Sequence, residues 1–456
     1  MKKLISLFLI FSMALCLVSC AGKPEIIPVS SPLNMLRVNG DGYLTDGSGI
    51  IQLRGVNFGG WLLQETWMCP VISLDKTVTV RDGEDDGWAN LDTLEAFESR
   101  FGKEKTAELF RSYQDNYITE SDFKNVKNLG FNCIRIPFWY RNFMADENGT
   151  YITENDNDNP GFIKLDWACR MAEKYGVYLI FDMHGCPGGQ SGDHSCGKSG
   201  RNYLYNSEEY QQIMENLWVK IAERYKDRAC IAAYDIMNEP LNNADSSHGV
   251  SAENAADPWQ DTTLRVAVYD RMIKAIRAVD PEHIITVEAI WRLDKLPDPS
   301  KMGWTNMMYQ LHSYDSDEKT VKELVKSLEK ARKRYKVAAY MGEFNPAIFY
   351  SGSVSMMDKS LISYTMWNYK TTSYGESAWG FYNKALTLSD IAALCPEAAR
   401  DKIMKQADEK IYSLEELTDR ELLSLYEKLW SAELLSTDSY TLNQSAAELL
   451  GCKVQE

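Results

Sequence analysis

The sequence predicts an α/β fold, a single (β/α)8 barrel with an N-terminal β-hairpin and a helical C-terminal extension. Short β-rich runs alternate with polar loops and helical patterns, and the eight such runs match the number that closes a barrel. No self-similarity with a period of about 20 to 50 residues indicates a solenoid. The predicted strands are 52–57, 131–137, 177–183, 230–238, 283–289, 306–312, 337–343 and 361–368.

The composition of the chain excludes some classes of binding partner. The chain has 456 residues, 45% of them hydrophobic, which is enough for a large core in one barrel, with a two- or three-domain reading as the alternative. Its net charge of −16 argues against binding nucleic acid or an anionic lipid surface by general electrostatics. The 12 Trp, 25 Tyr and 15 Phe residues exceed what a core requires, and some of them could stack on the apolar faces of sugars.

The N-terminus predicts export. Residues 1–19 form a signal peptide in which Lys2 and Lys3 precede an apolar run too short to span a membrane. The sequence Leu-Val-Ser-Cys at 17–20 resembles the lipobox of bacterial lipoproteins, which implies cleavage before Cys20 and acylation of that residue. We therefore expect a lipid-anchored protein on the bacterial cell surface or outer membrane, with ordinary secretion as the alternative. Residues 20–34 contain three prolines and are expected to form a tether reaching about 40 Å.

Residues 35–456 are expected to form the barrel domain. Asn-Gly-Asp-Gly at 39–42 and Asp-Gly at 46–47 predict a hairpin that plugs the barrel floor. Apolar spacing predicts barrel helices at 207–225, 262–279 and 319–335, and a capping box predicts a closing helix at 418–435. Residues 369–417 are then a long, partly helical excursion over the mouth, with a separate helical appendage as the alternative.

The cysteines favour no metal site, because their spacing matches no zinc pattern. Cys133, Cys169 and Cys230 fall in apolar segments and are expected to be buried thiols. Cys186 and Cys196 flank a Gly-rich loop in an exported protein, so a disulfide between them and two free thiols are both open.

Polar and aromatic residues stand at or just beyond the predicted strand ends, the rim at which barrel enzymes keep their chemistry. Each alone has a structural explanation, as a core histidine, a structural ion pair or a core aromatic residue. Their common location, with glutamates on different strands, favours a functional site. They are Glu65, Arg135, His184, Asn238, Glu239, His312, Tyr314, Glu343 and Trp367.

Two carboxyl groups across a cleft are what cleavage of a glycosidic bond needs. One must be protonated to serve the leaving oxygen, and the other must be ionised on the opposite face of the sugar. A nearby Arg135 would favour the charged form of one, and burial would raise the pKa of the other. Pro240 ends the fourth predicted strand just after Glu239. Since side chains alternate along a strand, Asn238 and Glu239 can share one pocket only if the strand end is irregular.

An ordered set of motifs resembles glycoside hydrolase family 5 of the retaining clan A, over about residues 53–382. The resemblance implies that Glu239 is the acid/base and Glu343 the nucleophile, oriented by Arg135 and Tyr314. It places Asn238 on the sugar 2-hydroxyl, Trp367 under the sugar, and His184 and His312 on other hydroxyls or behind them. The motifs are Arg-Gly-Val-Asn-Phe-Gly-Gly-Trp (54–61), Asn-Cys-Ile-Arg-Ile-Pro (132–137), Asp-Met-His-Gly (182–185), Asn-Glu-Pro (238–240), Leu-His-Ser-Tyr (311–314), Gly-Glu-Phe (342–344) and Trp-Asn-Tyr-Lys-Thr (367–371).

Within the family, residues 59–65 and 184–192 are most similar to the exo-β-1,3-glucanase branch. That resemblance implies that Glu65 accepts hydrogen bonds from the terminal sugar at the closed end of a pocket. The branch clamps the next sugar with two Phe residues, where this chain has Asp193 and Asp317. The expected substrate is a β-linked oligo- or polysaccharide, and the linkage stays open.

The leading hypothesis is a retaining, exo-β-1,3-glucanase-like β-glycosidase that needs no cofactor. An endo-β-1,4-glucanase or another β-hexan hydrolase of the family is one alternative, and a catalytically silent carbohydrate-binding lipoprotein is another. A metal-dependent hydrolase is disfavoured, because none of the five histidines is in an H-x-H or H-x-x-x-H arrangement.

Overall fold

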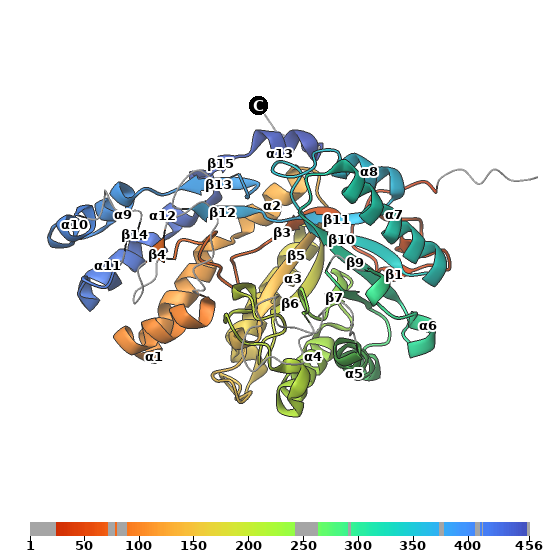
Figure 1. Cartoon of the computed structure of the whole chain (residues 1–456), viewed down its shortest axis with the longest axis horizontal. Coiled ribbons are helices and arrows are strands. Elements are labelled where there is room, and N and C mark those ends of the chain that lie inside the picture. Colours follow the sequence, from red (N-terminus) through yellow and green to blue (C-terminus); the bar gives the residue numbers. More distant parts are fainter. Residues whose placement is uncertain are drawn as a thin grey trace, which may run out of the picture.

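In the computed structural model, eight parallel strands form a closed barrel (Figure 1). The structure describes residues 24–71, 78–79, 89–241, 263–290, 293–373, 378–405, 411–412 and 414–453. Every predicted strand is present, although the fourth ends at Asp235 and not at Asn238. In barrel order the strands are β3 (Arg54–Asn57), β5 (Cys133–Trp139), β6 (Tyr178–Gly185), β7 (Ile231–Asp235), β8 (Ile284–Glu288), β9 (Met307–Ser313), β10 (Ala338–Phe344) and β11 (Ser363–Met366).

Helices cover the outside of the barrel, so its strands are buried on both faces, as parallel strands require. All residues of β5, β6, β9 and β10 are buried. The predicted helices 207–225, 262–279 and 319–335 are confirmed within one residue, and the Ser207 side chain caps the first of them by accepting from the Tyr210 N–H. The helices between strands are α1 (Asn90–Tyr117), α2 (Glu120–Asn128), α3 (Pro160–Tyr175), α4 (Glu208–Tyr225), α5 (Thr263–Val279), α6 (Pro299–Met302), α7 (Glu318–Tyr335) and α8 (Ser353–Ser360).

The N-terminal hairpin closes the floor, as predicted. Strands β1 (Arg37–Val38) and β2 (Leu44–Thr45) pair antiparallel. Leu36, Leu44 and Ile51 form an apolar cluster with residues near the N-terminal ends of the barrel strands, among them Tyr178 and Met308. This cluster excludes water from the barrel end opposite the predicted site.

Part of the predicted tether lies on this floor. The Ile27 N–H donates to the Ile50 carbonyl at 2.9 Å, and the Tyr178 hydroxyl donates to the Asn34 carbonyl at 2.8 Å. Residues 24–34 therefore do not extend away from the barrel. The signal peptide and Cys20 lie outside the described residues. No helix among the described residues is long and apolar enough to cross a membrane.

The chain after β11 forms a lobe beside the barrel. Strands β12 (Lys370–Ser373), β13 (Tyr382–Ala385) and β15 (Thr441–Leu442) form a small sheet, and β14 (Ile411–Tyr412) pairs with β4 (Val78–Thr79). Helices α9, α10, α11 and α12 lie near α1, on the left of Figure 1. The lobe helices are α9 (Leu388–Leu394), α10 (Glu397–Met404), α11 (Asp419–Leu429), α12 (Ala432–Leu435) and α13 (Gln444–Leu449).

The expectation of one barrel-closing helix at 418–435 is wrong. The segment is divided between α11 and α12, which both pack on α1, and α11 also packs on α9. The physical reason is its apolar face, since Trp430 stacks on Phe97 of α1 with centroids 5.4 Å apart. The 369–417 excursion is also divided. Its Trp379 borders the barrel mouth, whereas α9 and α10 belong to the lobe.

Candidate active site

Glu343 is the penultimate residue of strand β10, at the predicted rim. Arg135 Nη1 donates to one of its oxygens at 2.7 Å, and the Tyr314 hydroxyl donates to the other at 2.7 Å. The glutamate is only 4% exposed. Both oxygens accept from strong donors, one of them cationic, so the carboxylate is held in a fixed orientation.

Arg135 is the central cation of the site. It is fully buried on β5 and also contacts Asp182 at 3.1 Å and Asp235 at 2.9 Å. Its Nη2 donates to the Asn238 side-chain oxygen at 2.9 Å. Burial raises the pKa of Asp235 to about 7, although the charge of Arg135 opposes that rise. The guanidinium thus fixes the positions of Glu343 and Asn238 together.

The backbone at Glu239 is irregular, which is the condition for Asn238 and Glu239 to share one pocket. Strand β7 ends at Asp235, and Glu239 has a φ of +40°. A non-glycine residue in this region is held there by its surroundings. Its N–H donates to Glu288 Oε1 at 2.7 Å. The turn brings Asn238 and Glu239 to one network, because His312 contacts Glu239 and Arg135 contacts Asn238.

The Glu239 carboxyl lies 2.8 Å from His312 Nδ1, and its side chain is 23% exposed. Burial raises the pKa of Glu239 above its usual value, and the negative charge of Glu65 raises it further. Burial also lowers the pKa of His312 to about 4, so this imidazole is neutral at neutral pH. The raised pKa of Glu239 suits a group that donates a proton.

The short distance between the two glutamates fits a retaining mechanism. One Glu239 oxygen, one Glu343 oxygen and a ring nitrogen of His312 lie within 4.8 Å of one another. Retaining glycosidases have carboxyl groups about 5 to 5.5 Å apart, whereas inverting enzymes need about 6.5 to 9.5 Å to admit a water molecule. The same three groups are close enough to ligate a cation. Glu343 already accepts from Arg135 and Tyr314, however, so the cluster suits acid–base chemistry better.

Comparison with known proteins agrees with this geometry. The family described as cellulase (glycosyl hydrolase family 5) matches residues 93–373, which is more than half of the chain. The chain belongs to glycosyl hydrolase family 5. It is a glycoside hydrolase, and its carboxyl pair is that of a retaining β-glycosidase. The alternative of a catalytically silent binding protein therefore has no support.

Among the relatives of this family 5 enzyme is a β-xylosidase of Phanerodontia chrysosporium, 26% identical over 373 residues, which are 74% of this chain and 70% of the relative. A probable glucan 1,3-β-glucosidase A of Neosartorya fischeri is 29% identical over 273 residues, which are 59% of this chain. The match spans only 55% of that relative's length. The rutinosidase structure from Aspergillus niger has a TM-score of 0.51 at 15% identity, covering 72% of this chain and 92% of that one, and so supports the fold.

The other end of the site contains Glu65, which is 4% exposed. Its Oε2 accepts from Trp67 Nε1 at 2.9 Å and lies 3.0 Å from His194 Nε2. Burial opposes ionisation of Glu65, but the hydrogen bond and charge of His194 lower its pKa overall. His184 Nε2 lies 3.9 Å from the other oxygen, Oε1.

His184 and Trp367 form a stacked pair beside Glu65, with ring centroids 5.2 Å apart and planes at 10°. His184 Nδ1 contacts Asp182 at 2.7 Å, and its Nε2 lies 3.3 Å from the Asn238 side-chain nitrogen. Every predicted site residue in the barrel therefore belongs to one network, which runs from Glu65 to Glu343. Cys20, predicted for lipid attachment, is outside the described residues.

Three site residues were not predicted. Glu288 ends the fifth strand, and the strand-end rule that found the others applied to it as well. His194 lies in the Gly-rich loop after β6, in a short turn at His194–Cys196. Trp379 contacts Tyr314 and Trp67 from the chain after β11, with centroids 5.5 and 5.2 Å apart. Trp379 belongs to none of the motifs and to no predicted strand end, so no sequence signal marked it.

The structure answers whether Cys186 and Cys196 form a disulfide and what Asp317 does. Cys186 and Cys196 are separate buried thiols, not a disulfide, and Cys196 Sγ contacts the Ser191 hydroxyl. Asp317, which replaces a Phe of the exo-glucanase branch, caps α7 by accepting from the Thr320 N–H at 2.8 Å. That carboxylate stabilises a helix end, so the Phe clamp is not reproduced there.

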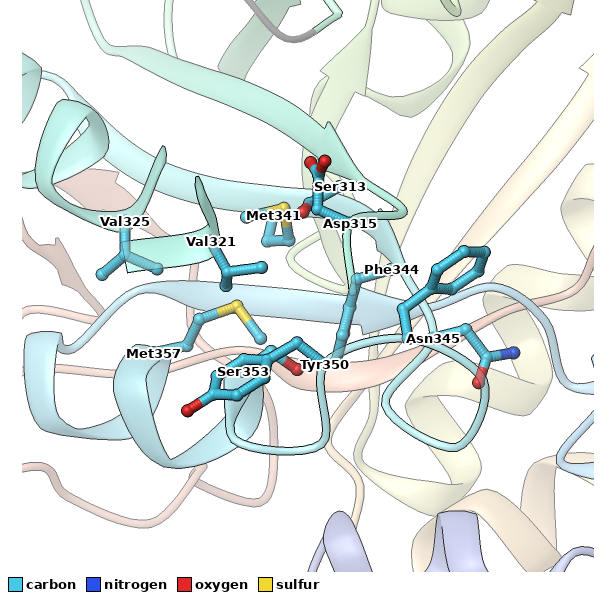
Figure 2. Close-up of a pocket in the computed structure, with 11 residues that line it drawn as sticks. Ser313, Asp315, Val321, Val325, Met341, Phe344, Asn345, Tyr350, Ser353 and Met357 are labelled. Atoms are coloured by element: carbon cyan, nitrogen blue, oxygen red, sulfur yellow. The ribbon is translucent and has the colours of Figure 1, made fainter. Parts of the chain in front are cut away.

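A small cavity lies behind the nucleophile strand, and Figure 2 shows its lining. Its walls are mainly apolar side chains of α7, α8 and β10, including Val321, Met357 and Met341. Glu343 is not among the residues that line it. The cavity is therefore a feature of helix packing and not part of the catalytic site.

Proposed function

We propose that this protein is an exo-acting retaining β-glycosidase that removes sugar from the non-reducing end of a β-glucan, with β-1,3 linkages the leading candidate. The observation that carries the exo assignment is the buried carboxyl of Glu65. Its Oε1 has no hydrogen-bond partner among the described residues, whereas Oε2 is held by protein donors. An unpaired buried carboxylate oxygen costs several kcal/mol, on the order of the desolvation penalty of a charge.

The hydroxyl groups of a terminal sugar would supply the missing donors, whereas a continuing polymer has fewer at that position. Aromatic side chains wall the same end. Trp67, which holds Glu65, contacts Trp379 with centroids 5.2 Å apart, and Trp379 contacts Tyr314 beside the nucleophile. This wall joins the loop after β3 to the chain after β11, and it favours a closed pocket.

The reaction follows from the two carboxyl environments. Glu343 attacks the anomeric carbon while Glu239 protonates the leaving oxygen, which gives a glycosyl-enzyme intermediate. Glu239, now ionised, takes a proton from water as that water releases the sugar from Glu343. Two inversions at the same carbon give net retention, so proton NMR should show the β-anomer as the first product. First-formed α-anomer would contradict the roles of the pair.

The substrate assignment rests on names of relatives and on motifs. The relative from Neosartorya fischeri is a probable glucan 1,3-β-glucosidase, and residues 59–65 resemble the exo-β-1,3-glucanase branch. Asp193 and Asp317 in place of the Phe clamp leave the linkage to experiment. Purified protein should be assayed on β-1,3-, β-1,4-, β-1,6- and mixed-linkage glucans, mannan and aryl β-glycosides.

Digestion of a long β-glucan tests exo action directly. Glucose or one short oligosaccharide should form from the earliest times with little loss of viscosity, and Glu65→Ala should lower kcat/KM by about 100-fold or more. Glu95→Ala, a change of an exposed glutamate on α1, is the matched control and should not alter either property. A rapid fall in viscosity with mid-length products would show the endo-glucanase alternative instead.

We also propose that the mature protein is exported and anchored through acylated Cys20. The support is the lipobox-like 17–20 and the apolar run before it. Cells fed a radiolabelled fatty acid should label the wild-type protein and not Cys20→Ala, which should leave the membrane fraction. Equal labelling of both proteins would contradict the anchor.

A further inference from the structure

Glu288 is a buried acid to which the mechanism gives no role. It is fully buried at the end of β8, and one of its oxygens accepts the Glu239 N–H at 2.7 Å. Its other oxygen, Oε2, lies 3.6 Å from His312 Nε2, and neither atom has a hydrogen-bond partner in the described part of the chain. On its other side, His312 Nδ1 lies 2.8 Å from Glu239 Oε1. Glu288 therefore lies next to Glu239 in two ways. Its carboxyl group contacts the Glu239 backbone N–H directly, and His312 lies between the two carboxyl groups.

The charges around Glu288 determine its protonation state. The cation Arg135 already contacts Asp182, Asp235 and Glu343. A fourth carboxylate would have no cation of its own among the described neighbours, and burial raises the pKa of Glu288 well above its usual value. The titratable and charged groups that face it are Asp235 from β7, Glu239 beyond it, His312 from β9, Tyr269 from α5 and Arg135 from β5.

The proton of neutral Glu288 can be placed from the contacts. Oε1 accepts from the Glu239 N–H, so the proton belongs on Oε2, which faces His312 Nε2. A neutral imidazole carries one proton, and Nδ1 is the ring nitrogen within hydrogen-bond distance of a carboxyl oxygen, so the proton belongs on Nδ1 and Nε2 is left bare, 3.6 Å from Glu288 Oε2. His312 Nδ1 then carries the N–H and donates to Glu239 Oε1. This leaves Glu239 Oε2 as the oxygen that holds the transferable proton.

We propose that Glu288 is a positioning residue for the acid/base, a neutral acid that fixes the left-handed backbone of Glu239 and the tautomer of His312. The proposal rests on the acid/base role of Glu239 in the proposed function. Its consequence is that the proton of Glu239 is held on one oxygen, aimed away from His312. A glutamine can make the same contacts as a neutral acid, with its oxygen on the Glu239 N–H and its NH2 group toward His312.

Substitution separates this role from a general structural one. Glu288→Gln should keep kcat/KM within about threefold of wild type on every substrate. Glu288→Met removes both contacts, and it should lower kcat/KM by about 100-fold or more on glycosides with poor leaving groups, the range expected for general acid catalysis. Loss on aryl glycosides with good leaving groups should be less than about fivefold, because those need little protonation. Thr286→Val, on the same buried strand, should behave as wild type.

Two results would overturn the proposal. If Glu288→Gln loses as much as Glu288→Met, the ionised form is required. If Glu288→Met loses equally on both kinds of leaving group, the residue has no specific link to acid catalysis. Glu239→Ala distinguishes a failure of this proposal from a failure of the proposed function. If Glu239→Ala shows no dependence on the leaving group, the acid/base role of Glu239 is wrong. If it shows that dependence and Glu288→Met does not, only the role of Glu288 is wrong.

A direct measurement covers the case in which Glu288→Met does not fold. Nitrogen-15 NMR of histidine-labelled enzyme near neutral pH, with His312→Gln to assign the signal, should show His312 protonated on Nδ1 and bare on Nε2. Glu288→Gln should show the same tautomer. A proton on Nε2 in the wild-type enzyme would overturn the proposed arrangement.

Discussion

The two catalytic glutamates differ because their neighbours differ. Glu343 accepts from Arg135 and Tyr314 on its two oxygens. Glu239 has no cation in direct contact among the described residues, and its partner His312 is neutral because burial lowers that pKa to about 4. In the proposed mechanism, an identical side chain thus serves as nucleophile in one place and as acid in the other.

This difference predicts distinct losses for the two variants. Glu343→Gln should abolish turnover on all substrates, because no covalent intermediate can form. Glu239→Ala should spare glycosylation by aryl glycosides with good leaving groups, and added azide should raise its turnover by replacing the attacking water. Steady-state kinetics on a leaving-group series measures both. Equal loss across the series for Glu239→Ala would contradict its acid role.

The basic limb of the pH profile should report Glu239. The acid works only when protonated, so activity should fall as the pH rises through its pKa, which burial and the charge of Glu65 both raise. Glu65→Gln removes that negative charge, so the basic limb of kcat/KM on a poor leaving group should move to lower pH. Glu65→Asp keeps the charge and should leave the limb nearer its original position. A shift of the Gln variant to higher pH would contradict the coupling.

At the scale of single elements, the ends of the strands place the chemistry. Strand β7 stops at Asp235, three residues before Asn238, and the left-handed Glu239 turns its carboxyl toward β9. Strand β10 shifts register against β9 between Met341 and Glu343, so the intervening Gly342 lies close to side chains of β9. These irregularities give the two glutamates their separation.

Gly342 is expected to tolerate no side chain. An added Cβ would lie 2.1 Å from Gln310 Oε1 and 2.9 Å from His312 Nε2. Gly342→Ala should displace His312 from Glu239, lower kcat/KM by about 10-fold or more, and cost about 1 to 3 kcal/mol of stability. Gly40→Ala is the matched control, because no atom lies within 4 Å of the added Cβ there. Kinetics and urea denaturation measure both variants, and wild-type kinetics for Gly342→Ala would contradict the packing argument.

At the scale of the whole molecule, the C-terminal lobe is integrated with the barrel. Lys370 at the start of β12 is fully buried, and its Nζ donates to the Leu435 carbonyl at 2.8 Å. The Tyr117 hydroxyl at the end of α1 donates to the Lys370 carbonyl at 2.9 Å. Burial lowers the pKa of Lys370 to about 8. The lobe and α1 are thus expected to unfold together with the barrel.

Trp430 tests this integration. It is fully buried, it stacks on Phe97, and its Nε1 donates to the Pro70 carbonyl at 2.9 Å. Trp430→Ala should lower the free energy of unfolding by about 3 to 5 kcal/mol in one cooperative transition. Trp430→Phe should lose less, since it keeps an aromatic ring against α1. An independent early transition for Trp430→Ala in guanidinium unfolding would show that the lobe is a separate unit.

The sequence alone determined the barrel and the residues that gather at its rim. Strand and helix periodicity depends on local burial patterns, so all eight predicted strands and three of the four predicted helices are present. The strand-end rule works because parallel strands in a barrel finish at one rim, which gathers residues from Glu65 to Trp367. Glu288, at the end of the fifth strand, follows the same rule.

Only the tertiary structure decided the rest. The 418–435 segment has an apolar face that could pack on strands or on α1, and the aromatic residues of α1 decide between them. Whether Cys186 and Cys196 are joined depends on backbone positions, not on spacing. The contacts of Glu288 with Glu239 and His312 join residues from three different strand ends. Such contacts leave no periodic signal in the sequence, because each depends on distances that only the closed barrel fixes.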